Sequence, residues 1–139
     1  MVGSASSGEK VQVISAYALR MTCFFRQGHT VLILAGELDP YNWPDFRRVL
    51  NTIRDEGEGS LIVVAAPRTY LDSTNLGALA RVMKTLRAGD PVRTVHLVAP
   101  DSHSYVNRLL RTAGLTRVFP LHATLESALA AVSGHETDG

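Results

Sequence analysis

The chain has 139 residues, of which 45% are hydrophobic and 19% charged, and its formal net charge is +1. This length and composition predict one globular domain with a substantial core, because two domains would need a longer chain and a disordered chain would be less apolar. The near-zero charge, without any predicted face of interleaved basic and aromatic residues, argues against nucleic acid as a partner.

The two ends of the chain are polar. We expect residues 1–15 to be a flexible leader and residues 133–139 a flexible tail, on either side of a domain at residues 16–132. The start of the chain lacks the pattern of a signal peptide, and no apolar stretch approaches the ~20 residues that span a bilayer. The one cysteine, Cys23, cannot form an internal disulfide, which fits a reducing compartment. The sequence therefore predicts a cytoplasmic protein without a membrane partner.

Apolar patterns predict alternating strands and helices. The first two strands, at residues 19–25 and 31–35, are joined by a hairpin-length connection and should pair antiparallel. Asn42 then opens a helix with Asp45 three positions on, a variant of the capping box. The next strand, at residues 61–66, is apolar throughout, which predicts a central strand covered on both faces. The apolar face of the first helix consists of Phe46, Val49, Leu50 and Ile53.

The second half of the chain continues this rhythm. A second helix begins at Ser73, a strand follows at residues 94–99, a third helix comes next, a short strand lies near residues 117–119, and a fourth helix covers residues 125–132. We expect an α/β fold: a single domain with a mixed sheet of four to five strands and four helices, an N-terminal antiparallel hairpin preceding parallel β-α units. The inward residues expected on the second and third helices are Leu76, Leu79, Ala80, Met83, Val106, Leu109, Leu110 and Ala113.

The first candidate recognition loop, at residues 36–41, follows the carboxyl end of a strand, where open α/β sheets place ligand and partner contacts. It contains Glu37 and Asp39, but a carboxylate pair beside a proline is more typical of a solvated turn than of acid/base catalysis. Tyr41 and Trp43 are adjacent aromatic residues. They either anchor an interface or hold the first helix against the sheet.

The second candidate loop, at residues 70–77, also follows a strand and leads into a helix. Asp72 and Ser73 both suit the N-cap, which by itself is a structural role. The same position also stabilises an added phosphate, because unpaired N–H groups and the positive end of the helix dipole lie there. A hydrolase with Ser73 as nucleophile would be expected to carry a G-x-S-x-G elbow, and this loop lacks both flanking glycines.

The histidines show no metal-binding spacing such as H-x-x-x-H or H-E-x-x-H. With a single cysteine in the chain, the sequence predicts no metal site and no cofactor. The five histidines are His29, His96, His103, His122 and His135.

Taken in order, the motifs resemble the anti-sigma-factor antagonist family, which is built on the STAS domain. Residues 35–39 match the family's G-E-L-D motif, and residues 71–79 match its D-S-[ST]-G-L-G-x-L motif. Residues 107–110, followed by Gly114, Leu115 and Phe119, fit its later helix, Gly-Leu turn and short strand. The resemblance extends over about residues 19–132.

The resemblance implies a bacterial, cytoplasmic regulatory protein that is not an enzyme. Such a protein binds an anti-sigma-factor serine kinase, which supplies ATP and Mg²⁺, and thereby frees a sigma factor. Phosphorylation of Ser73 would switch it off and a serine phosphatase would restore it; we expect a monomer or weak dimer with no nucleic-acid partner. The implied partner-binding residues are Glu37, Asp39, Tyr41, Asp72, Ser73, Thr74, Asn75 and Gly77.

Two departures from the family pattern support an alternative. Asn75 stands where the family usually has glycine, and the strand at residues 61–66 is apolar where the family commonly has an acidic or amide residue. Asn75 adds a side chain at a point of close backbone approach. The alternative is a divergent, non-phosphorylated STAS interaction module that binds another regulatory protein or a small ligand.

Overall fold

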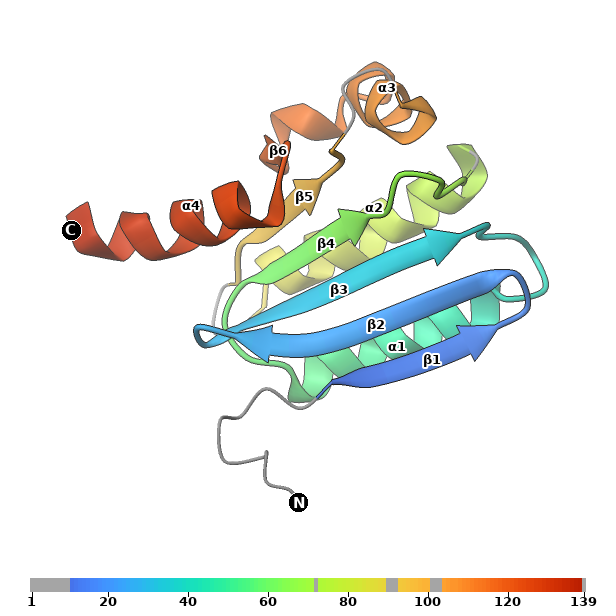
Figure 1. The fold of residues 1–139 in the computed structure, drawn as a ribbon, viewed down its shortest axis with the longest axis horizontal. Coiled ribbons are helices and arrows are strands. Elements are labelled where there is room, and N and C mark those ends of the chain that lie inside the picture. Colours follow the sequence, from blue (N-terminus) through green and yellow to red (C-terminus); the bar gives the residue numbers. More distant parts are fainter. Residues whose placement is uncertain (1–10, 72, 90–92, 101–103, 139) are drawn as a thin grey trace.

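A six-stranded mixed sheet forms the centre of the molecule (Figure 1). The computed structural model describes residues 11–71, 73–89, 93–100 and 104–138. Strands β1 to β3 pair antiparallel and β3 to β6 pair parallel, in sequential order, so the predicted hairpin and parallel units are confirmed. The strands are β1 (Gln12–Ala16), β2 (Leu19–Arg26), β3 (His29–Gly36), β4 (Leu61–Ala65), β5 (Val95–Val98) and β6 (Leu121–His122).

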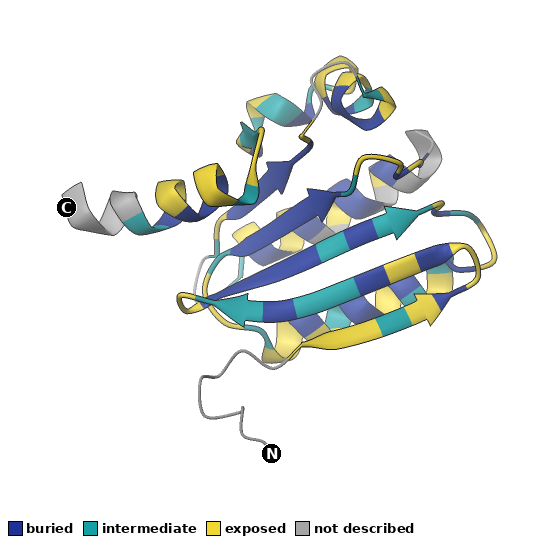
Figure 2. Ribbon diagram, viewed as in Figure 1, coloured by how far each residue is buried: buried dark blue, intermediate teal, exposed yellow. Residues whose placement is uncertain are grey.

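Helices cover both faces of this sheet. Helices α1 and α2 lie behind the sheet in Figure 1, and α4 packs on the other face against β4 and β5. The central strand β4 is buried along its whole length, as predicted (Figure 2). No helix in the described part of the chain is long and apolar enough to cross a membrane. The helices are α1 (Trp43–Glu56), α2 (Ser73–Arg87), α3 (Tyr105–Thr112) and α4 (Leu125–Asp138).

The predicted apolar faces of the first two helices are buried in one core cluster under the sheet. A second, smaller cluster joins α4 to the opposite face through Ala128, Leu129 and Val132. Each large side chain in these clusters stabilises the fold by about 1.5–3 kcal/mol relative to an exposed one. The buried residues of α1 and α2 are Phe46, Val49, Leu50, Ile53, Leu76, Leu79, Ala80 and Met83.

The sheet has six strands where four to five were expected. Strand β1 lies largely within residues 1–15, which we expected to be a leader; it is an edge strand exposed along most of its length, so its apolar pattern is weak. The strand predicted near residues 117–119 is wrong: Leu115–Arg117 form a 3-10 helix, and the two-residue strand β6 follows at Leu121. At the other end, α4 continues to Asp138, into the expected tail.

Helix α3 is shorter than predicted. Ser104 caps it by accepting a hydrogen bond from Asn107 N at 3.1 Å, and the helix ends at Thr112. Ala113, expected to face inward, is therefore exposed at the C-cap. Asn107 is buried instead, where its amide donates to Ala99 O at 3.3 Å.

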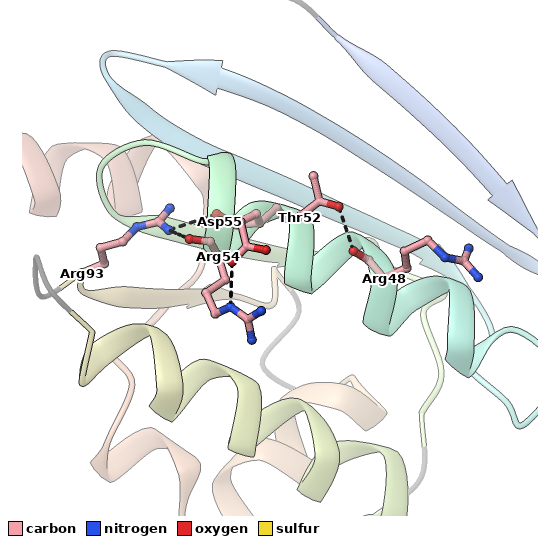
Figure 3. A network of polar contacts seen from close by, with 6 residues as sticks. Arg48, Thr52, Arg54, Asp55 and Arg93 are labelled. Carbon is pink, nitrogen blue, oxygen red and sulfur yellow. Dashed lines mark hydrogen bonds and ion pairs between the residues drawn. The ribbon is translucent and has the colours of Figure 1, made fainter.

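Arg93, in the segment before β5, forms side-chain hydrogen bonds to the end of α1 (Figure 3). Its Nη1 donates to Ile53 O at 3.0 Å and its Nε to Gly59 O at 2.7 Å. Ile53 O also accepts from Gly57 N at 2.8 Å, so the guanidinium is a second donor to this carbonyl, and its positive charge stabilises the helix end electrostatically. These two hydrogen bonds hold the turn between α1 and β4 in place.

Candidate functional site

The two candidate loops lie against each other at the carboxyl end of the sheet. Tyr70 N donates to Gly36 O at 2.9 Å, and Leu38 N donates to Tyr70 O at 2.9 Å. Glu37 and Tyr70 form an isolated parallel β-bridge. This pairing extends the β3–β4 ladder beyond the strand ends. The structure therefore joins residues 36–41 to residues 69–71, and we call these two segments, with the start of α2 at Ser73–Gly77, the recognition edge.

The second loop is anchored on both sides of Ser73. Before it, Thr69 Oγ1 donates a buried hydrogen bond of 2.7 Å to Leu34 O, and Leu71 is buried. After it, Leu76 is buried in the core cluster. Ser73 is the first residue of α2, as predicted, so its backbone is held between two fixed points at a helix start.

Several predicted residues of this loop cannot be placed further. Asp72 lies outside the described residues, as do the side chains of Ser73, Thr74 and Asn75. Their capping and partner-binding roles stay predictions. Gly77 is exposed, and a Cβ atom built on it would meet no other atom within 4 Å.

The side chain of Asn42 is fully buried and holds the first loop through hydrogen bonds to its backbone. Its Oδ1 accepts from Asp39 N at 2.9 Å, and its Nδ2 donates to Glu37 O at 2.8 Å and to Tyr17 O. The predicted capping box is wrong, because Asn42 makes no side-chain cap bond to α1 and Asp45 instead forms an ion pair within the helix. The amide joins the β1–β2 turn to the β3–α1 loop.

The two carboxylates of the first loop have different surroundings. Asp39 Oδ1 accepts from Tyr41 N at 2.8 Å and from Asn42 N at 3.1 Å, so this side chain shapes the loop. Glu37 is exposed. A charge change at Asp39 would disturb the loop itself, and Glu37 is therefore the cleaner probe of partner contact.

The aromatic residues of the first loop also separate into two roles. Trp43 is half-buried, packs against the core cluster and lies 5.4 Å from the ring of Phe46, so it holds α1 against the sheet. Tyr41 is 79% exposed. The sequence left open whether these two residues anchor an interface or hold the first helix against the sheet. Trp43 has the structural role, whereas the exposed Tyr41 can still contact a partner.

Sequence reasoning assigned no role to three further tyrosines at this end of the sheet, although Tyr70 lies in the second candidate loop. Tyr17, in the β1–β2 turn, lies 5.5 Å from Tyr41 between ring centroids. Tyr70 stacks on Tyr105 of α3 at 4.9 Å with an interplanar angle of 18°. Both pairs join segments that are distant in the chain, so no local pattern could have predicted them.

Two histidines that sequence spacing left unconnected are in contact. His96 Nδ1 and His122 Nε2 are 3.0 Å apart across β5 and β6, with the rings stacked. Burial, together with the charges of His122 and His29, lowers the pKa of His96, and burial lowers the pKa of His122. No group of three or more potential metal ligands gathers among the residues that the structure describes.

This pair predicts a loss of stability in mild acid. Because both folded-state pKa values lie below the unfolded value of about 6.5, the stabilising contribution is complete above that pH and is lost as the pH falls below it. We expect the melting temperature to drop by a few degrees between pH 7.5 and pH 5.5, and His122→Gln to reduce that drop. Equal pH slopes for both proteins in thermal melts would contradict the prediction.

The concave features of the molecule differ in size and place. An apolar void of about 20 Å³ lies behind the recognition edge, lined by residues such as Leu71, Leu76 and Val106. It has room for about one water molecule and none for a metabolite. A broad concavity of about 1170 Å³ lies at the amino end of the parallel strands, near His29 and Arg93.

Comparisons with known proteins place these features in context. The family model described as STAS domain matches residues 23–128. An anti-sigma-B factor antagonist of Staphylococcus aureus strain NCTC 8325 is 35% identical over 82 residues, covering 59% of this chain and 72% of the relative. The relative of the same description in Staphylococcus epidermidis is 39% identical over 57 residues, 41% of this chain, and the match spans about half, 53%, of that relative's length.

A solved structure shares the fold. The crystal structure of an anti-sigma factor antagonist from Mycobacterium paratuberculosis superposes with a TM-score of 0.68 at 22% sequence identity. The match covers 89% of this chain and 95% of that one. At this identity the likeness supports the architecture, including the mixed sheet.

Proposed function

The chain belongs to the STAS domain family, and from that premise we propose that it acts as an anti-sigma-factor antagonist switched by phosphorylation of Ser73. In this proposal it binds an anti-sigma-factor serine kinase in the cytoplasm and thereby frees a sigma factor. The observation that supports it best is the recognition edge, where two hydrogen-bonded loops frame the helix start that carries Ser73. The chain acts as substrate and regulator rather than as an enzyme.

The proposed switch divides the chemistry between two proteins. The kinase supplies ATP and Mg²⁺, and the γ-phosphoryl group passes to the Ser73 oxygen while the hydroxyl proton goes to a base of the kinase and ADP leaves. The α2 start accepts the added charge because unpaired N–H groups and the helix dipole favour an anion there. The added charge of about −1.5 to −2 weakens kinase binding, and a serine phosphatase restores the binding form.

The alternative is a module of the same fold that binds a regulatory protein or small ligand without phosphorylation. Asn75, where the family usually has glycine, favours it. The two proposals share the recognition edge and differ in whether Ser73 accepts phosphate. We expect a monomer or a weak dimer in both.

Reconstitution of the partner exchange tests the proposed function. The purified anti-sigma-factor kinases of the source genome, each bound to its sigma factor, are mixed with the chain, and free sigma factor is measured by gel filtration. We expect one kinase to release its sigma factor. On addition of ATP and Mg²⁺, intact-protein mass should rise by about 80 Da, one phosphate. Release without this species supports the alternative, and no release from any kinase rejects the antagonist function.

Gly77 offers a test that separates stability from binding. An exposed glycine inside a helix costs about 0.5–1 kcal/mol relative to alanine, and no neighbouring atom requires its small size. If the kinase approaches α2 closely here, Gly77→Ala should raise the free energy of unfolding by that amount and weaken kinase binding about ten-fold. Urea denaturation and titration calorimetry measure the two effects.

The matched control for Gly77 is Lys84→Ala, an exposed position farther along the same helix. It should leave kinase binding within two-fold of wild type. If Gly77→Ala binds the kinase as tightly as wild type does, this part of α2 lies outside the interface.

A further inference from the structure

All four tyrosines of the chain lie exposed at one end of the sheet, in two ring pairs. Tyrosine is enriched at protein interfaces, because a rigid ring offers a large contact area and the hydroxyl tolerates water. The pair in the β1–β2 turn and the β3–α1 loop is the more exposed, with Tyr17 at 69% and Tyr41 at 79%. This pair is therefore the stronger candidate for a contact with another protein.

The backbone that carries Tyr17 is strained. Tyr17 and Ala18 have φ of +26° and +61°, in a turn where glycine or asparagine is the usual choice. Such conformations persist only where the surrounding structure imposes them, and they cluster at binding sites. Here the fully buried Asn42 amide binds Tyr17 O, and Glu37 N donates to Ala18 O at 2.8 Å. The fold thus holds Tyr17 beside Tyr41 at a cost in stability.

The same contacts place the backbone of Glu37, an exposed acidic residue, against the turn that carries Tyr17. Glu37 shares the Asn42 amide with Tyr17, since Asn42 Nδ2 donates to the carbonyl oxygens of both residues. Two aromatic rings and a carboxylate suit one type of side chain above others. A guanidinium stacks on aromatic faces and pairs with a carboxylate through its planar fork of donors.

We infer that Tyr17, Tyr41 and Glu37 form a receptor for an arginine side chain of the partner protein. The inference rests on the proposed function, because it takes the partner to be the kinase that approaches the recognition edge. The receptor lies in the first loop and the β1–β2 turn, whereas the phosphate acceptor is at the start of α2. It should therefore determine affinity and leave the transfer step unchanged.

Steady-state phosphorylation by the kinase that modifies the wild-type chain tests this receptor. Tyr41→Leu and Glu37→Gln should each raise KM about ten-fold without changing kcat, whereas Tyr41→Phe, which keeps the ring, should stay within two-fold of wild type. The matched control is Glu126→Gln, an exposed carboxylate on α4. In the double variant Tyr41→Leu/Glu37→Gln the loss should be less than multiplicative, because both groups bind one guanidinium.

Tyr17→Asn adds a readout that a purely structural role would not give. Asparagine adopts a positive φ more readily than tyrosine, so this variant should melt at a higher temperature while its KM rises. A rise in melting temperature with unchanged KM would overturn the receptor, as would wild-type KM in Tyr41→Leu and Glu37→Gln. If the wild-type chain binds a kinase but is not phosphorylated, the same variants are compared by titration calorimetry, which tests the receptor apart from the phosphoswitch.

Discussion

We expect Ser73→Ala to abolish phosphate incorporation while leaving kinase binding intact. Alanine removes the acceptor oxygen, and the fold loses at most a helix cap, worth about 0.5–2 kcal/mol. The buried anchors Leu71 and Leu76 on either side of the position hold the backbone of the helix start in place. The variant should therefore remain folded and release the sigma factor even when ATP is present.

Intact-protein mass after incubation with kinase, ATP and Mg²⁺ is the measurement. Wild type and Thr74→Ala should both gain about 80 Da, one phosphate, and Ser73→Ala should gain none. Ser73→Asp should fold and bind the kinase more weakly, since a carboxylate supplies part of the charge of a phosphate. A phosphorylated species that persists in Ser73→Ala would move the acceptor to Thr74 or to another hydroxyl.

The long amphipathic elements were predictable because their signal is local. Phe46, Val49, Leu50 and Ile53 repeat at helical spacing, and every one of them is buried. The uninterrupted apolar sequence of β4 likewise predicted that this strand lies in the interior of the sheet. In these segments the interior side of the element is determined by the order of its own residues.

The elements that sequence reasoning missed depend on partners distant in the chain. Strand β1 exposes most of its side chains and is held by backbone pairing with β2. Because backbone pairing does not require apolar side chains, the sequence of β1 shows only a weak apolar pattern. Asn42 fits the pattern of a helix cap, but its amide meets Tyr17 O across the fold instead. The tyrosine pairs belong to the same class, since each joins two separate loops.

The candidate site divides in the same way. Motif order predicted the two loops and Ser73 at a helix start, and the structure adds that the loops are hydrogen-bonded through Tyr70. The sequence could not separate Glu37 from Asp39, because both are acidic residues of one turn. The hydrogen bonds from Tyr41 N and Asn42 N to Asp39 distinguish them. The motif therefore predicted where Glu37 and Asp39 lie, whereas only the hydrogen bonds in the structure show that the Asp39 side chain shapes the loop.

Gly36 is the position at the recognition edge where we expect the largest loss of stability. Its φ is +116°, and a Cβ atom built there would collide with the carbonyl oxygen of Ala18 in the β1–β2 turn. The backbones approach closely at this point, where Glu37 N donates to Ala18 O at 2.8 Å. The glycine of the G-E-L-D motif thus allows the turn that carries Tyr17 to lie against the end of β3.

Gly36→Ala should lower the free energy of unfolding by roughly 2–6 kcal/mol, because backbone strain and steric overlap each cost about 1–3 kcal/mol. Gly114→Ala separates the two causes, since Gly114 also has a positive φ, +77°, but a Cβ atom there would meet nothing within 4 Å. In this control the free energy of unfolding should fall by the backbone strain alone, about 1–3 kcal/mol. Urea denaturation at pH 7.5 measures both variants. If Gly36→Ala is no less stable than Gly114→Ala, the β1–β2 turn can move away from β3 at little cost, and the ring pair built on that turn would not be rigidly held.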